Sequence, residues 1–202
     1  MKIIPTSILF LFLITACSIR PPAKPPVTRY YLEPDVALTC KPPRNQHIMK
    51  LRFINGVSSA LTQHITYKKS DFKTGSYLYS RWDQSPNRSI MTQLYTAFKE
   101  SDIFTQVVYE NSPVKSDLGL QIKVLRFEHH FEDEENSSAL IELDATLYNS
   151  RTHQLVASRL FRSEVQAKTN NAQGGVIAFN QAVGDILSTL ICWTAKQSNT
   201  TD

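Results

Sequence analysis

The densest run of side chains capable of acid–base or metal chemistry is a pair of histidines followed by four acidic residues: His129, His130, Glu132, Asp133, Glu134 and Glu135. Imidazole and carboxylate groups bind metal ions and transfer protons. Adjacent residues of a strand point to opposite faces, so the two histidines are poorly placed to share one metal ion. Because the run lies between two predicted strands, we interpret it as a solvated hairpin loop and predict no metal site.

The sequence lacks the common catalytic motifs. It contains no Gly-rich phosphate loop and no HExxH, GxSxG or CxxC pattern, which are typical of nucleotide-binding proteins, zinc proteases, hydrolases and redox proteins. The remaining histidines, His47, His64 and His153, lie in separate segments with no nucleophile motif nearby. We therefore predict no catalytic residue, no metal and no cofactor, and the chain is not expected to be an enzyme.

A second cluster combines three aromatic rings with one arginine on a predicted strand: Tyr77, Tyr79, Arg81 and Trp82. Amphipathic rings and a cation suit a half-wet surface, so one interpretation is a contact for a partner protein or for lipid headgroups. The alternative is a core strand whose rings cover the helical stripe of Ile90 and Leu94, because aromatic residues at strand spacing are usually buried. The sequence leaves both interpretations open.

The N-terminus predicts the compartment of the chain. Lys2 precedes an apolar run, Ile8–Ile14, which is too short to span a bilayer and is typical of a secretory signal peptide over residues 1–16. The following Ile14-Thr15-Ala16-Cys17 resembles the bacterial lipoprotein box, in which the cysteine thiol accepts a diacylglyceryl group before cleavage. We therefore predict Cys17 as the lipidated N-terminus of the mature chain.

Residues 17–28 are expected to be a lipidated tether. They contain four prolines, which favour an extended backbone. Acyl chains such as palmitate on Cys17 would hold the protein on a bilayer effectively permanently. Ser18 stands where an aspartate resembles an inner-membrane retention signal, so anchoring at the periplasmic side of the outer membrane is favoured over the inner membrane.

The bulk composition is that of a folded domain. Of the 202 residues, 42% are hydrophobic and 20% are charged, which is enough apolar surface for one core. The formal net charge of +4 is small and scattered, and this argues against nucleic acid as a partner. We expect one folded domain at residues 29–196 and a disordered tail at residues 197–202.

Cys40 and Cys192 are the remaining cysteines. In an oxidising periplasm two such thiols are commonly paired, and a bridge would tie the start of the domain to its last helix. Pairing requires Cα atoms within about 7 Å, which the sequence does not show. A disulfide and two buried free thiols therefore both stay open.

Hydrophobic periodicity predicts two helices and eight strands. A helix is expected at residues 85–101, with Ser85 accepting amide hydrogen bonds as its N-cap, and another at residues 172–196. Strands are expected at residues 29–33, 47–54, 65–68, 76–82, 104–110, 118–124, 139–148 and 155–165. This order predicts an α+β fold, a two-layer sandwich of a mainly antiparallel sheet with two helices packed on it.

The order of these elements resembles the ABC-type transport auxiliary lipoproteins. After the lipoprotein box come five segments that carry the resemblance: Tyr30-Tyr31-Leu32-Glu33, Tyr79-Ser80-Arg81-Trp82, the helix around Ile90–Leu94, Leu120–Glu128, and the hairpin from Ala139 to Phe161 with Arg162. The closing helix completes the match. The likeness covers almost the whole mature chain.

This resemblance implies an accessory role in a transport system. The expected partners are an MCE-domain protein and the permease and ATPase of an ABC transporter, and the expected cargo is phospholipid or another lipid. It also implies that the chain can self-assemble into a homo-oligomer. A structural or assembly lipoprotein of an outer-membrane biogenesis or secretion apparatus is the alternative.

Overall fold

The computed structural model describes residues 24–199. The expected signal peptide, Cys17 and the first part of the expected tether lie outside the described residues, as do residues 200–202 of the expected tail. The last helix continues to Ser198, so residues 197 and 198 belong to it and not to a tail.

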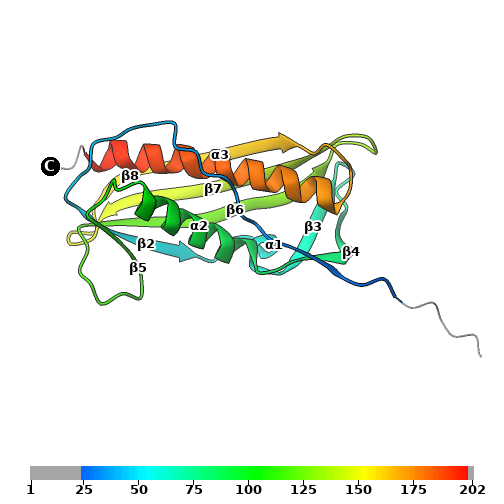
Figure 1. Ribbon diagram of the computed structural model, residues 1–202, viewed down its shortest axis with the longest axis horizontal. Coiled ribbons are helices and arrows are strands. Elements are labelled where there is room, and N and C mark those ends of the chain that lie inside the picture. Colours follow the sequence, from blue (N-terminus) through cyan, green and yellow to red (C-terminus); the bar gives the residue numbers. More distant parts are fainter. Residues whose placement is uncertain (1–23, 200–202) are drawn as a thin grey trace, which may run out of the picture.

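Eight strands form one sheet, and three helices accompany it (Figure 1). The strands are β1 (Thr28–Tyr30), β2 (Ile48–Ile54), β3 (His64–Lys69), β4 (Thr74–Trp82), β5 (Gln106–Tyr109), β6 (Leu118–Phe131), β7 (Ser137–Asn149) and β8 (Leu155–Gln166). The helices are α1 (Ser58–Leu61), α2 (Pro86–Glu100) and α3 (Ala172–Ser198). The predicted α+β class is confirmed, and the four-residue α1 was not predicted.

The sheet is mixed, and β6 is its central strand. On one side β6 pairs with β7, and β7 with β8, both antiparallel as the consecutive hairpins predict. On the other side the first half of β6 pairs with β2, which pairs with β5, and the second half pairs with β3. The β2/β6, β3/β6 and β2/β5 pairs are parallel, because α2 and other long connections carry the chain back before the next strand begins.

Helices α2 and α3 lie over one face of the sheet, here named the covered face, and the opposite face is named the open face (Figure 1). In α2 the buried stripe includes Ile90, Leu94 and Phe98, as its periodicity predicts. Ser85 occupies the N-cap position, but its side chain makes no capping hydrogen bond. Its backbone carbonyl accepts from the amides of Arg88 and Ser89 instead, so the predicted side-chain cap is wrong.

Helix α3 is the main cover of the sheet. Asn171 caps it, since its side chain accepts a hydrogen bond from the amide of Gly174 at 2.9 Å. By length and composition α3 is apolar enough to cross a membrane. However, 67% of its most apolar 18-residue stretch is buried inside the fold, where α3 packs against β7 and β8. We therefore interpret it as the core helix of this domain.

A β-bulge in β6 decides which of its residues point inward. The pairing with β7 shifts register between Val124 and Arg126. Before the shift Leu120, Ile122 and Val124 are buried, and after it Phe127 and His129 are buried. One extra residue therefore changes inward-facing positions from even to odd numbers, and the strand continues to Phe131.

Candidate functional site

The predicted aromatic cluster lies on a bulged stretch of β4. Thr66 of β3 pairs with Ser76, but His64 pairs with Arg81, so β4 has three more residues than β3 between these pairs. The guanidinium of Arg81 donates to the backbone carbonyls of Tyr77 and Ser80 and closes the bulge. Bulges of this kind redirect side chains, and here the cluster is divided between interior and surface.

Trp82 points into the core. Its side chain is 1% exposed, and its ring centroid lies 5.9 Å from that of Phe127 and 5.6 Å from that of Phe179. A partner or lipid cannot reach it, so the contact role suggested for Trp82 is wrong. The core interpretation is confirmed for the burial of Trp82, but the rings that Trp82 contacts belong to β6 and α3, whereas that interpretation placed it over the stripe of Ile90 and Leu94 on α2.

The surface of the bulge is apolar. Leu78 is 68% exposed and Tyr79 is 39% exposed. β1 pairs with β4 so that Thr28 lies opposite Ser80, which places Val27, also exposed, beside Tyr79. We name Val27, Leu78 and Tyr79 the bulge patch; Leu78 and Val27 carried no signal in the sequence pattern.

Tyr77 belongs to a buried chain of hydrogen bonds. Its hydroxyl lies 2.8 Å from Nδ1 of His129, whose Nε2 lies 3.0 Å from Oγ of Ser137. The Ser137 hydroxyl donates in turn to the side-chain oxygen of Asn170 at 2.6 Å. The chain thus connects β4, β6 and β7 to the segment that leads into α3.

Burial controls the charge of this chain. His129 is 0% exposed, and burial lowers its pKa to about 4, so the imidazole is neutral at neutral pH. Burial likewise raises the pKa of Tyr77, and its hydroxyl stays protonated. Gly175 of α3 lies against the imidazole, since a Cβ there would come within 2.6 Å of Nδ1 of His129. A buried neutral histidine hydrogen-bonded to two hydroxyls has a structural role, because it links strands β4, β6 and β7.

The predicted solvated loop is therefore only partly correct. His129 is a core residue of β6, His130 lies on the opposite face, and the acidic turn starts only after Phe131. In that turn the carboxylate of Asp133 accepts hydrogen bonds from the amides of Glu135 and Asn136. Within residues 24–199 no group of three or more His, Cys, Asp or Glu side chains is arranged to hold a metal ion.

A row of ion pairs crosses the open face from β3 to β8. Its members alternate in sign: Lys68, Glu128, Arg126, Glu142, Arg162 and Glu164. The side chain of Glu128 is only 4% exposed. Burial raises the pKa of this carboxyl, but hydrogen bonds from Lys68 and Arg126 outweigh burial and hold the pKa below its ordinary value. Glu128 is therefore charged at neutral pH.

A groove with both apolar and polar lining lies beside this row, where β2 and β3 separate and α1 occupies the space between them. It has a volume of about 610 Å³ and is lined by hydroxyl-bearing residues of three elements, among them Ser58, Thr66 and Ser76. Lys68 and Arg126 also line it, but both are already paired with Glu128. The hydroxyl groups of the groove can form hydrogen bonds with a polar ligand. Its two cations are already neutralised by Glu128 and do not form a binding site for a further anion.

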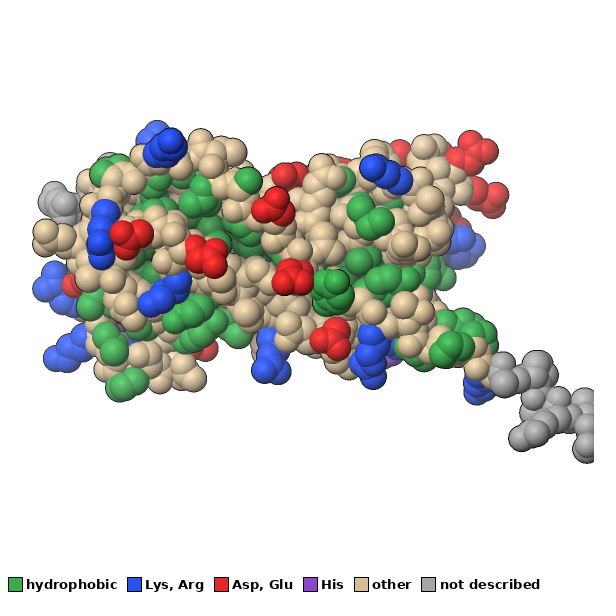
Figure 2. All heavy atoms as spheres, in the orientation of Figure 1, with side chains coloured by type: hydrophobic (Ala, Val, Ile, Leu, Met, Phe, Trp, Pro, Cys, Tyr) green, Lys and Arg blue, Asp and Glu red, His purple; other side chains and the backbone are tan. Residues whose placement is uncertain are grey.

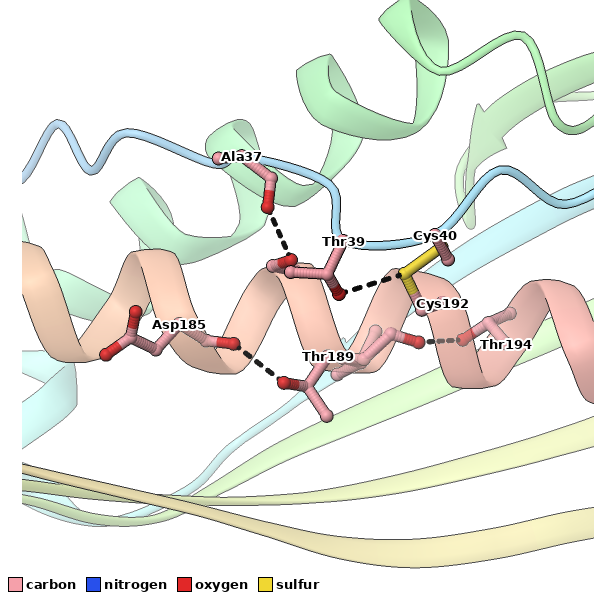
Figure 3. Close-up of a disulfide and its surroundings, with 9 residues drawn as sticks. Ala37, Thr39, Cys40, Asp185, Thr189, Cys192 and Thr194 are labelled. Carbon is pink, nitrogen blue, oxygen red and sulfur yellow. Dashed lines mark hydrogen bonds between the residues drawn. A yellow bond between two sulfur atoms is a disulfide. The ribbon is translucent and has the colours of Figure 1, made fainter.

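On the other side of the molecule, the segment between β1 and β2 crosses the outer surface of α3 as a strap (Figure 3). Cys40 and Cys192 are joined by a disulfide, with Cα atoms 5.8 Å apart. The amide of Glu33 donates to the side chain of Asn180, and the hydroxyl of Ser188 donates to the carbonyl of Ala37. These bonds fix the strap along the helix.

Solved structures share this fold. A protein of the DUF330 family from Xanthomonas campestris has a TM-score of 0.80 at 22% identity, over 86% of this chain and 98% of that chain. An uncharacterized protein has a TM-score of 0.63 at 15% identity, over 84% and 99% of the two chains. A hypothetical protein, CT253 from Chlamydia trachomatis, has a TM-score of 0.51 at 6% identity, over 77% and 100%. At these identities the likeness shows the fold alone.

No curated protein sequence matches this chain. A sequence model of one family, the ABC-type transport auxiliary lipoprotein component, matches residues 30–190. The matched range runs from the end of β1 through most of α3 and includes the strap, the bulge of β4 and the central strand β6. The chain therefore belongs to the family of ABC-type transport auxiliary lipoprotein components.

Proposed function

We propose that this protein is a periplasmic lipoprotein, held on the outer membrane through Cys17, that serves as an accessory component of an MCE-type ABC transport system. The system would move phospholipid or another lipid across the cell envelope. The family match over residues 30–190 is the observation that carries the proposal. The lipoprotein box at Cys17 and the sorting residue Ser18 support the anchor and its membrane.

The surface supports a docking role and not a catalytic one. Six ionisable side chains of the open face, from Lys68 to Glu164, are used in ion pairs with one another, and the buried histidine is used in hydrogen bonds between elements. Such groups stabilise a scaffold. We therefore propose that the protein acts on its partners by binding.

Strand β8 is the surface we propose for the MCE-domain partner or the permease. Among residues 24–199, β7 is the only strand that pairs with β8, so the outer backbone edge of β8 is open to another strand. Leu160 is 56% exposed on this strand, between Arg159 and Arg162. An apolar side chain flanked by cations is suited to a specific protein contact.

Affinity capture of the acylated full-length protein tests this function. MCE-domain, permease and ATPase subunits are expected to copurify with the wild type. Leu160→Asp should reduce their recovery, because it places a charge in the proposed contact. Leu61→Asp is the matched control, since Leu61 is also exposed, at 40%, but lies on α1 and outside the proposed surface.

Recovery of secretin or outer-membrane assembly subunits in place of the transporter subunits would overturn the proposal in favour of a structural lipoprotein.

Separation of inner and outer membranes on a density gradient tests the outer-membrane location proposed from Ser18. The mass of the purified complex tests whether the protein forms the homo-oligomer that the family resemblance implies. Turnover of lipid by the purified protein would contradict a purely binding role.

A further inference from the structure

The hairpin between β3 and β4 exposes an aromatic ring completely. Phe72 lies at its tip, and no part of its side chain is covered by the described residues. Its φ is 66°, in the left-handed region that bulky L residues rarely adopt. A turn that needs this conformation is usually occupied by glycine or asparagine, so the ring is not explained by the turn itself.

The tip is held firmly in place. The amide of Lys69 donates to the carbonyl of Lys73 at 2.8 Å, and the amide of Phe72 donates to the carbonyl of Lys69 at 3.1 Å. Ser70 binds the neighbouring β6–β7 hairpin, since its amide donates to the carbonyl of Phe131 and its hydroxyl to that of Glu132. The ring therefore projects from a rigid support.

The tip lies at the end of the molecule where the chain leaves toward Cys17. Because β1 runs parallel to β4 with Thr28 opposite Ser80, the residues before Thr28 lead away toward the end where β4 begins. Figure 1 shows residues 24–27 leaving the fold at the end where the β3–β4 and β6–β7 hairpins turn. Figure 2 shows hydrophobic side chains gathered where the chain leaves, and Val27 of the bulge patch is exposed there.

The length of the chain allows the tip to meet the membrane. Cys17 and Thr28 are 11 positions apart, since 28 − 17 = 11, and a chain of that length reaches about 35–40 Å at most. The six steps of β4 from Ser80 back to Thr74 span about 20 Å. The tip therefore lies within reach of the bilayer in which an acylated Cys17 would be held.

The charges at this end favour an apolar contact over an electrostatic one. Within segments 68–73 and 132–135, which form the two hairpin turns, Lys68, Lys69 and Lys73 are outnumbered by Asp71 together with the four acidic residues at 132–135. An excess of carboxylates is repelled by anionic headgroups. Phe72 offers the hydrophobic area, and the expected contact does not depend on anionic lipid.

We propose that Phe72 inserts into the bilayer that holds Cys17, so that the β3–β4 hairpin is a second and apolar membrane contact. The inference rests on the lipid anchor of the proposed function. One ring alone binds a membrane weakly, but the anchor converts its insertion into an intramolecular event at high effective concentration. The contact fixes the orientation of the domain and leaves β8 free for a partner.

Fluorescence quenching on vesicles tests the insertion. Acylated full-length Phe72→Trp is placed on phosphatidylcholine vesicles with or without bromine on the acyl chains, which quenches nearby tryptophan. Its added emission is expected to shift to the blue and to fall about twofold with the brominated lipid, because the side chain reaches the acyl boundary. The wild type provides the baseline from Trp82, which is buried, and from Trp193.

Leu155→Trp is the matched control. Leu155 is another exposed apolar residue, and it pairs with Tyr148 at the end of the 13-residue strand β7 that lies about 40 Å from the β6–β7 turn. A tryptophan at this position is expected to show no quenching. Adding Cys17→Ser to Phe72→Trp should abolish the quenching, because the effective concentration is lost.

The outcomes separate the two proposals. If the protein is acylated by mass and floats with vesicles, but Phe72→Trp is quenched no more than Leu155→Trp, the membrane contact is overturned and the anchor stands. If the mass shows no acyl group on Cys17, the anchor is wrong and the membrane contact is overturned with it. Selective quenching of Phe72→Trp in the acylated protein supports both.

Discussion

Glu128 and His129 are consecutive residues of β6, and they point to opposite faces of the sheet. Both residues are buried, with 3% of Glu128 and 0% of His129 exposed as whole residues. Glu128 on the open face is charged, because Lys68 and Arg126 contact it. His129 on the covered face is neutral, because burial lowers its pKa and its hydrogen-bond partners Tyr77 and Ser137 offer no compensating charge.

The difference shows that burial by itself does not determine the charge of a side chain. A buried ionisable group keeps its charge where opposite charges compensate for the lost water, and loses it where only neutral partners are present. On the open face the cations remain partly in water, with Lys68 54% and Arg126 37% exposed. On the covered face the surroundings of His129 are aromatic rings and α3.

The largest expected effect concerns the strap that closes over the covered side. Replacing Cys40 and Cys192 by serine should lower the free energy of unfolding by about 4–5 kcal/mol, because the bridge closes a loop with a sequence separation of 152. Urea unfolding with and without reductant measures this. Reductant should leave the double variant unchanged, and a wild type insensitive to reductant would contradict the prediction.

The bulge of β4 allows a matched comparison of core and surface. Trp82→Ala removes a ring that packs on Phe127 and Phe179 and should cost about 3–5 kcal/mol of unfolding free energy. Tyr79→Ala, on the outer side of the same bulge, should change it by less than about 0.5 kcal/mol. Equal losses in chemical denaturation would mean that the bulge does not separate the two residues.

The buried histidine predicts a pH dependence. The folded-state pKa of His129, about 4, lies below the unfolded value, about 6.5, so the unfolded chain binds a proton first. Its contribution to stability is present above pH 6.5 and is lost as the pH falls toward 4, by up to about 3 kcal/mol. Unfolding free energies measured between pH 7 and pH 4 test this.

Variants isolate that contribution from the carboxylates, which also respond to acid. His129→Gln should be less stable at pH 7 by about 1–3 kcal/mol and should show a flatter profile between pH 6.5 and pH 4. His64→Gln, at an exposed position, is the control and should keep the wild-type profile. Parallel stability profiles for His129→Gln and the wild type would show that His129 does not cause the loss of stability between pH 6.5 and pH 4.

The smallest expected effect is on the open face. Glu128→Gln should cost about 1–2 kcal/mol at pH 7, since Lys68 and Arg126 can regain water when the carboxylate is removed. Because the folded-state pKa of Glu128 is lowered, its contribution is present above the ordinary carboxyl pKa and is lost as the pH falls through the folded-state value.

The stability difference between the wild type and Glu128→Gln should therefore become smaller in acid, because Glu128 stabilises the fold only when it is ionised. Thermal denaturation at two pH values measures the change. Glu132→Gln, in the exposed turn, is the control and should have no measurable effect. A loss that stays constant down to pH 3 would mean that the charge of Glu128 is not what stabilises this face.

Much of the fold follows from short-range periodicity. The alternation from Leu118 to Val124 predicts a strand, and the four-residue spacing of Ile90, Leu94 and Phe98 predicts a buried helical stripe, as observed. Both patterns are local, because a side chain's direction follows from its own position in a regular element.

The errors occur where regularity is interrupted. The bulge between Val124 and Arg126 shifts the inward positions by one residue, so the alternation of Leu118–Val124 does not continue to Phe131, and the sequence pattern wrongly places His129 in a loop. The bulge of β4 similarly separates Trp82 from Tyr79. An extra residue in a strand is defined by its partner strand, and the chain's own pattern does not contain it.

Local sequence patterns are sufficient to predict α2, α3, the regular strands, the α+β class and the family resemblance carried by their order. The sequence also contains the lipoprotein box at Cys17, because that motif is recognised as a linear segment. The folded structure is needed to show that Cys40 lies beside Cys192, that β2 and β3 pair in parallel with β6, and that Glu128 is charged while His129 is neutral. Strand pairing, bulges and solvation depend on residues far apart in the chain, and these residues meet only when the chain folds.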